Sequence, residues 1–541
     1  MAESAGKYDY IIVGAGTAGC VLANRLTQDK GVSVLLIEAG AKDDYIWVHI
    51  PLGFRQMIDN PRTDWRYRTQ PEAGLNGRSL LYPTGKILGG SSCINSMIYQ
   101  RGQSQDYDTW ADLTGDMSWR WEQVLPLFRA TEDHEQGADN WHGVGGDWHI
   151  EKQKTHWKIL DAFREAAAQT GIPKIDDFSR GEGCAYFYVN QKNGLRLNTA
   201  KAFLRTITRR GNLEIMTGSQ VRRLIIEETD QGKVCTGVEF VGGGKEWIAD
   251  VSRETILTAG TFGSPQILQR SGIGPAALLQ EHGIRVLQDL PGVGENLQDH
   301  MPLSMRYKIL GAKSLNTSGR GYLGMAAMGL EYIFKKNGLV STVPSPLGAM
   351  VCSDPGQARP NLSYQIQPWS QAEVGPETDA FPAFTANVSN LRPTSRGQVR
   401  ILSADISVAP AIRMNYLSTD EDRNIAAAAI QLTRKIVAAP ALQPYAPQEI
   451  KPASQQETDL HQLASQIAIA GSNPVGSCKM GAAGDHRAVV DSELKVRGVA
   501  GLRVADASIM PLIIAGDTSA TTIMIAEKAA QLMRASAKIG A

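Results

Sequence analysis

A glycine-rich turn near the N-terminus holds the first residues whose types and spacing point to chemistry. Residues 14–19 (GAGTAG) have the pattern GxGxxG, in which Gly14, Gly16, Thr17, Ala18 and Gly19 are the candidate binding residues. In such a turn the first glycine permits a tight bend, the second lets backbone amides approach a pyrophosphate, and the third lets a helix pack closely on a strand. Glu38 follows about 20 residues later, where an acid binds both hydroxyls of a ribose and disfavours a 2′-phosphate. Together these residues predict a dinucleotide site.

The elements that must position this turn follow from the hydrophobic pattern around it. Residues 8–13 and 33–37 are short apolar runs that predict buried strands, and residues 20–26 predict a helix with Leu22 and Leu26 on one face. Strand, turn, helix, strand and acid stand in this order within about 30 residues, as in a dinucleotide-binding βαβ unit. The pattern does not distinguish NAD from FAD.

Further motifs along the chain resemble the signatures of one enzyme family. They occupy residues 85–95 (GKILGGSSCIN), 260–274, 291–300 (PGVGENLQDH), 501–508 and 523–528. In this order they resemble the glucose–methanol–choline (GMC) oxidoreductases, which use FAD, and the resemblance covers essentially the whole chain. It implies oxidation of the CH–OH group of a small-molecule alcohol by hydride transfer to flavin N5, with O2 or another acceptor taking the electrons from the flavin.

The same resemblance assigns the residues that contact the flavin. Besides the N-terminal turn and Glu38, they are Gly89, Gly90, Ser91, Asn95, Val221, Asp506, Ala507 and Thr518. The loop with Gly89 and Gly90 has few side chains, so its backbone can pass close to a pyrophosphate or a flavin ring. Val221 matches the position whose backbone contacts the adenine, and Asp506 the aspartate near the pyrophosphate, although a plain helix N-cap is the alternative for Asp506.

The mode of FAD attachment is also predicted by one position of the first motif. Ile94 stands where some relatives have a histidine that is bonded covalently to the flavin. A hydrocarbon side chain cannot form that bond. We therefore expect FAD to be bound non-covalently.

The catalytic positions depart from the family pattern. Alcohol oxidation needs a base for the hydroxyl proton, and relatives use a histidine in an HPVGTCRMG-like segment with an asparagine or second histidine as its partner. This chain has Asn473 in the first position and Asp517 in the second. Because an amide is no base at neutral pH, Asp517 is the candidate base and Asn473 the orienting amide. Ser96 is a third candidate, offering a hydroxyl to a substrate oxygen, unless it is only a small residue packed beneath the ring.

These departures leave three functions open. The first is an FAD-dependent alcohol oxidase or dehydrogenase in which Asp517 takes the proton, although its carboxylate equally suits a cationic amine on the substrate. The second is an FAD enzyme of the same fold with another reaction, such as a photodecarboxylase or a lyase, since relatives of that kind lack the usual histidine. The third is an FAD-binding protein with weak activity, including an altered variant.

The resemblance implies an α/β fold with a Rossmann-like FAD-binding domain interleaved with an α+β substrate-binding domain built on an antiparallel sheet. We expect the FAD-binding domain in residues 1–150, 195–308 and 470–541, and the substrate domain in residues 151–194 and 309–469. Within the latter, residues 361–367 alternate with period two and predict a strand, and residues 423–439 are helical by composition.

Composition excludes several other classes of protein. Hydrophobic residues make up 43% of the 541 positions, which is ample for a large core and argues against disorder. Lys+Arg and Asp+Glu both number 55, so the chain lacks the basic excess that binding to nucleic acid needs. No run approaches the ~18–20 apolar residues of a membrane span.

Cysteine usage and the N-terminus indicate the compartment. The six cysteines lie far apart without a CxxC pair, which favours reduced thiols. The chain enters its first strand almost at once and shows no signal peptide. We therefore expect a cytoplasmic protein.

Overall fold

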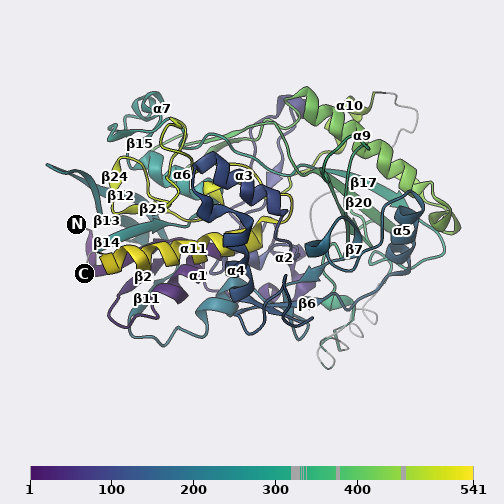
Figure 1. Ribbon diagram of the computed structural model, residues 1–541, viewed down its shortest axis with the longest axis horizontal. Coiled ribbons are helices and arrows are strands. Elements are labelled where there is room, and N and C mark those ends of the chain that lie inside the picture. Colours follow the sequence, from purple (N-terminus) through teal and green to yellow (C-terminus); the bar gives the residue numbers. More distant parts are fainter. Residues whose placement is uncertain are drawn as a thin grey trace.

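Two β-sheets lie next to each other, the larger on the left and the smaller on the right of Figure 1. The computed structural model describes residues 2–318, 329, 330, 332, 334, 336, 338–372, 378–452 and 459–539. Both described chain ends lie beside the larger sheet, at the left of the molecule (Figure 1).

The larger sheet is built around the predicted βαβ unit. Its strands are β1 (Glu3–Val13), β2 (Val34–Ile37), β11 (Leu213–Met216), β12 (Ser219–Thr229), β13 (Gly232–Gly242), β14 (Lys245–Leu257), β24 (Val499–Ala500) and β25 (Leu502–Val504). The order is β11-β2-β1-β14-β13-β12, with β24 beside β13 and β25 beside β14. β1 is parallel to both of its neighbours, and its last four residues are buried, as expected for a central parallel strand. The predicted strands at 8–13 and 33–37 are confirmed.

The smaller sheet is antiparallel throughout. Its strands are β7 (Gly183–Tyr186), β17 (Pro302–Lys308), β18 (Leu347–Val351), β19 (Leu362–Gln367), β20 (Ala383–Asn390) and β23 (Gln448–Lys451), in the order β23-β17-β20-β19-β18-β7. In β19, buried Leu362, Tyr364 and Ile366 alternate with half-buried polar residues, which confirms the strand predicted from period-two alternation.

Helices cover both sheets. They are α1 (Thr17–Leu26), α2 (Phe54–Met57), α3 (Ser104–Thr114), α4 (Trp121–Thr131), α5 (Lys158–Gln169), α6 (Gly260–Arg270), α7 (Ala276–Glu281), α9 (Asp420–Val437), α10 (Leu460–Ile467) and α11 (Thr518–Ile539). α11 packs against α1 across the larger sheet, whereas α9 packs on β20 of the smaller one (Figure 1). The Thr419 hydroxyl caps α9 by accepting from the Asp422 amide at 3.2 Å, and this helix confirms the one predicted at 423–439.

The described structure also contains shorter strand pairs and a three-stranded sheet. They are β3 (Tyr67–Arg68) with β4 (Leu81–Tyr82), β9 (Gln191–Lys192) with β10 (Leu195–Arg196), β15 (Ile273–Gly274) with β16 (Gln288–Asp289), β21 (Gln398–Arg400) with β22 (Ala411–Arg413), and β5 (Glu132–His134) with β6 (Trp148–Lys152) and β8 (Tyr188–Val189). β3 and β4 lie in the stretch that leads from the first βα unit to the glycine loop at residues 89–90.

One strand of the smaller sheet, β17, comes from residues that the sequence assigns to the cofactor-binding part. β17 pairs with β20 and β23 of the smaller sheet. The boundary expected at residue 308 instead assigns residues 302–308 to the cofactor-binding part. Pairing partners distant in sequence decide this membership, and the glycine motif that ends at residue 300 gave no sign of it.

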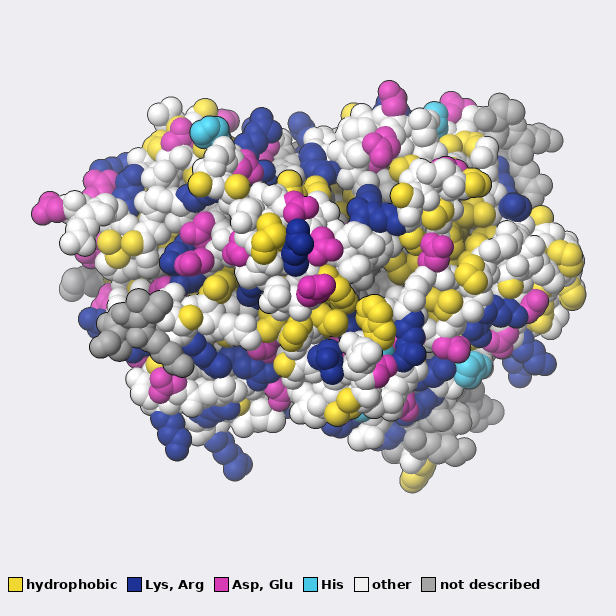
Figure 2. All heavy atoms as spheres, viewed as in Figure 1, with side chains coloured by type: hydrophobic (Ala, Val, Ile, Leu, Met, Phe, Trp, Pro, Cys, Tyr) yellow, Lys and Arg dark blue, Asp and Glu magenta, His cyan; other side chains and the backbone are white. Residues whose placement is uncertain are grey.

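The visible surface carries charges of both signs. In Figure 2, Lys and Arg side chains are interspersed with Asp and Glu over this face, and hydrophobic side chains gather in its right half, near β17 and β20. The zero net charge is therefore not the sum of two large opposed patches on this face. Within the described part of the chain, no helix has the length and hydropathy that crossing a bilayer would require.

Candidate active site

A cavity that opens to solvent, with about 1,420 Å³ of space including the solvent at its mouth, lies where β1 and β14 end and where α1, α6 and α11 begin. Ligands of open α/β sheets bind at the carboxyl ends of the strands, so the place itself is typical. Its lining runs from the glycine turn at the start of α1 to Asn473 and to Asp517 at the start of α11.

The cavity brings together most of the predicted site residues. Its lining includes Gly14, Gly16, Thr17, Ala18, Glu38, Gly90, Ser91, Asn95, Val221, Asn473, Asp506, Ala507, Asp517 and Thr518. They come from segments far apart in the chain. The fold thus brings these separate motifs together at one site.

Three predicted residues, Gly19, Gly89 and Ser96, do not line the cavity. A Cβ at Gly19 would stand 1.9 Å from the Gly14 carbonyl oxygen, so this glycine permits close packing, as expected. Gly89 has a φ of +98° and bends the chain before the lining residue Gly90. Ser96 is half-buried outside the lining, and its contact with a substrate stays a prediction.

The start of α1 is shaped to hold an anion. Its N-cap is Gly16, and no side chain caps the free amides of the first turn. A Cβ at Gly14 would lie 2.6 Å from the Thr258 carbonyl oxygen, whereas one at Gly16 would meet no protein atom closer than 4.0 Å. Uncapped amides and the positive end of the helix dipole favour a phosphate here.

Glu38 lies in the same cavity at the end of β2. Its two carboxylate oxygens accept from the amides of Ala15 at 2.8 Å and Gly40 at 2.7 Å. Each oxygen keeps lone pairs for further donors such as ribose hydroxyls. Burial raises the pKa of Glu38 to about 7.

Asp506 joins the end of β25 to the start of α6. Its carboxylate accepts from the Ser508 amide at 2.8 Å, the Gly260 amide at 2.9 Å and the Ser264 hydroxyl at 2.6 Å. The capping geometry considered as an alternative is therefore present, and the same residue also lines the cavity. Burial raises the pKa of this carboxyl group.

The two candidate catalytic residues meet through the start of α11. Asp517 accepts from the Ser519 amide at 3.0 Å and so caps the helix, while its open side faces the cavity. Burial raises the pKa of Asp517 to about 6, and no charged group among the described residues contributes to that shift. The Thr518 hydroxyl donates to Oδ1 of Asn473 at 3.4 Å.

An aromatic wall was not predicted from the sequence. Trp65 and Tyr67 stack with ring centroids 5.7 Å apart, and Tyr67 meets Phe262 edge-on at 5.6 Å. All three line the cavity, and Lys86 places its ammonium 4.4 Å above the Trp65 ring. In the sequence, the only indication of this wall is the aromatic pair in residues 64–69 (DWRYRT), shortly before the glycine loop. The pattern of these residues does not show which way the rings face.

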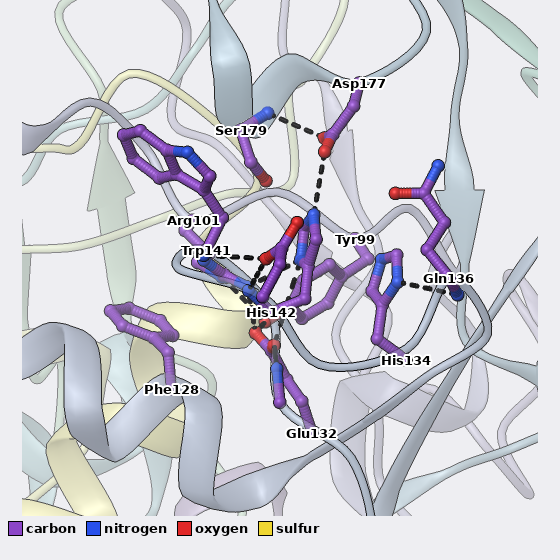
Figure 3. A network of polar contacts seen from close by, with 12 residues as sticks. Tyr99, Arg101, Phe128, Glu132, His134, Gln136, Trp141, His142, Asp177 and Ser179 are labelled. Atoms are coloured by element: carbon purple, nitrogen blue, oxygen red, sulfur yellow. Dashed lines mark hydrogen bonds and ion pairs between the residues drawn. The ribbon is translucent and has the colours of Figure 1, made fainter.

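A buried polar network joins Arg101, Glu132 and His142 (Figure 3). His142 lies between Arg101, 3.1 Å from Nδ1, and Asp177, 2.7 Å from Nε2, and Arg101 pairs with Glu132 at 2.5 Å. The adjoining Gly102 amide would lie 3.1 Å from a Cβ at position 516. The network therefore anchors the chain against which the loop preceding Asp517 packs.

Comparison with known proteins gives consistent matches over nearly the whole chain. Residues 8–302 and 393–526 match the two family models described as GMC oxidoreductase. An oxygen-dependent choline dehydrogenase of Photobacterium profundum is 38% identical over 535 residues, covering 97% of this chain and 92% of that protein. An alcohol dehydrogenase (acceptor) of Pseudomonas putida is also 38% identical, covering 97% of this chain and 95% of its own.

Solved structures extend the likeness to three dimensions. The crystal structure of pyridoxine 4-oxidase from Mesorbium loti superposes with a TM-score of 0.88 at 32% identity, covering 98% of this chain and 99% of that one. The two sheets thus belong to one known architecture.

Proposed function

This chain belongs to the GMC oxidoreductase family and uses FAD, and on that premise we propose that it oxidises the CH–OH group of an alcohol with Asp517 as the base. The two relatives are named for dehydrogenation of choline and of alcohols. The observation that carries the proposal is a carboxylate in the cavity with one protein hydrogen bond and no charged partner among the described residues.

The residues present fit FAD. The glycine-lined start of α1 suits the pyrophosphate, Glu38 suits a ribose, and the backbone near Val221 suits the adenine. Ile94 offers no atom for a covalent bond, which supports non-covalent attachment. When bound, FAD supplies the hydride acceptor of the reaction.

Asp517 is suited to take the hydroxyl proton. A carboxyl group whose pKa is about 6 is largely ionised at neutral pH and is a stronger base than an ordinary aspartate. Since the Ser519 amide occupies one oxygen, the other is open to a substrate in the cavity. Asn473 cannot take the proton, but its amide is held by Thr518 and can donate to the substrate oxygen.

We further infer an interleaved arrangement of two domains. The larger sheet takes strands from residues 3–37, 213–257 and 499–504, and the smaller sheet from residues 183–186 and 302–451. This alternation supports the segments expected from the sequence. The pairing of β17 favours a boundary before residue 302 in place of 308.

The proposal is tested by mixing the holoenzyme anaerobically in the dark with primary, benzylic and amino alcohols. Bleaching of the flavin absorption band by at least one alcohol is expected. No bleaching with any of them contradicts alcohol oxidation. Turnover of a carboxylic acid only under blue light would instead identify a photodecarboxylase. Alcohol oxidation that appears only in Asn473→His would identify a weak variant.

The rate of flavin reduction should depend on pH through Asp517. We expect the rate to be high above pH 6 and to fall about tenfold per pH unit well below it, because only the ionised carboxylate accepts the proton. Stopped-flow absorbance from pH 4.5 to 8 measures this limb. If the limb persists unchanged in Asp517→Asn, it belongs to another carboxyl group, such as Asp299, whose pKa burial also raises to about 6.

A further inference from the structure

The loop that carries Asn473 lies between two points of backbone pairing. Gln298 pairs with Val475 through two backbone hydrogen bonds of 3.0 and 2.9 Å, and Leu303 pairs with Ala468. Between these points the Ile469 amide still donates to the Pro302 carbonyl oxygen at 2.9 Å, but among the described residues no backbone hydrogen bond joins residues 470–474 to residues 299–301. Asn473, in this stretch, lines the cavity.

The side chain of Asp299 supplies hydrogen bonds to this stretch. Its Oδ1 accepts from the Asn473 amide at 2.8 Å, and its Oδ2 accepts from the Gly471 amide at 3.0 Å and the Tyr416 hydroxyl at 2.5 Å. The residue is 3% exposed, and the described residues supply no ion-pair partner for it. The carboxylate therefore binds the backbone on both sides of Ser472.

The loop conformation between these bonds is strained. Ser472 has a φ of +60°, in the left-handed region that a residue with a side chain rarely adopts. At Gly471 a Cβ would lie 1.5 Å from the His300 carbonyl oxygen, so the chain passes directly against the neighbouring segment. A conformation of this kind persists only where surrounding bonds enforce it.

We propose that Asp299 is a positioning residue for Asn473. Its carboxylate binds the backbone amide of Asn473 and so fixes the loop. In this position the side-chain oxygen Oδ1 of Asn473 accepts from the Thr518 hydroxyl, next to Asp517. The kinetic consequence rests on the proposed alcohol oxidation, whereas the fixing of the loop does not.

Asp422 provides a matched control. It is also buried, at 5% exposure, and accepts from the amides of Thr394 at 2.9 Å and Ser395 at 2.8 Å. These bonds hold a segment other than the loop at residues 469–474. Asp422→Asn therefore makes the same chemical change in a similar setting while leaving the bonds of that loop in place.

Hydrogen exchange tests the positioning without any substrate. An asparagine at position 299 has a single acceptor oxygen, so at least one loop amide loses its partner. In the holoenzyme, we expect peptides covering residues 469–475 to exchange at least about tenfold faster in Asp299→Asn and at the wild-type rate in Asp422→Asn. Unchanged exchange in Asp299→Asn overturns the proposal. Should that variant not fold, Tyr416→Phe removes one donor, and unchanged exchange there overturns it equally.

Kinetics then tests whether the effect passes through Asn473. We expect Asp299→Asn to slow flavin reduction about 10- to 100-fold with little change in the dissociation constant of the alcohol, because misplacement by about 1 Å can have an effect of that size. In an Asn473→Ala background the same substitution should change the rate less than about twofold. Additive effects overturn positioning through Asn473. Faster exchange in a protein that no alcohol reduces would overturn the proposed function and support the fixing of the loop.

Discussion

Asp517→Asn is expected to slow reduction of the flavin by an alcohol about 10²- to 10⁴-fold, the usual contribution of a general base. The amide cannot take the hydroxyl proton at neutral pH. It does keep the helix cap, because asparagine and aspartate cap helices about equally well. The Ser519 amide thus retains its acceptor, and α11 should begin where it does in the wild type.

The comparison that isolates the base is another N-cap aspartate. Asp459 accepts from the amides of His461 and Gln462 at the start of α10, and it does not line the cavity. Asp459→Asn should leave the rate of flavin reduction unchanged. Stopped-flow absorbance on both holoenzymes, with the alcohol that bleaches the wild type, provides the measurement. A rate in Asp517→Asn within about threefold of the wild type would mean that some other group takes the proton.

The choice of substrate separates a base from a cation-binding group. If Asp517 binds an amine on the substrate, Asp517→Asn should weaken binding of amino alcohols and leave benzylic alcohols unaffected. If Asp517 takes the proton, both classes should slow alike. The proposal expects the second pattern.

The βαβ unit was predictable because its signal is local. Residues 8–38 contain strand, turn, helix and acid in one continuous stretch, and the burial of β1 and β2 follows directly from their apolar runs. Gly19 was equally predictable, because the steric demand comes from its own turn: a Cβ there would stand 1.9 Å from the Gly14 carbonyl oxygen.

What escaped prediction depends on contacts between distant segments. Asp299 stood within a recognised motif, but its bonds to residues 471 and 473 arise only when the two segments lie next to each other. The direction of the Trp65 and Tyr67 rings depends on Phe262, about 200 residues away in sequence. Ser96 shows the converse: the motif predicts both Asn95 and Ser96 for the site, but of the two only Asn95 lines the cavity.

Gly16→Val should weaken FAD binding roughly 100-fold while leaving the apoprotein nearly as stable as the wild type. A Cβ there would meet no protein atom closer than 4.0 Å, and Gly16 lines the cavity, so we expect the γ-methyl groups of valine to point into the cavity. Displacing a pyrophosphate from the first-turn amides removes one or two hydrogen bonds to a charged group, at about 1.5–3 kcal/mol each. Poorer capping of α1 by valine lowers the free energy of unfolding by only about 1 kcal/mol.

Gly19→Ala is the control for Gly16→Val, because at Gly19 an added side chain would clash with the protein itself. Its Cβ would stand 1.9 Å from the Gly14 carbonyl oxygen and 2.9 Å from the Thr258 hydroxyl, so the apoprotein itself should lose about 1–3 kcal/mol of stability. Urea unfolding of the two apoproteins, with FAD titration followed by flavin fluorescence, separates the effects. Equal loss of apoprotein stability in both variants would show that Gly16 serves packing, and FAD binding unchanged in Gly16→Val would place the pyrophosphate elsewhere in the cavity.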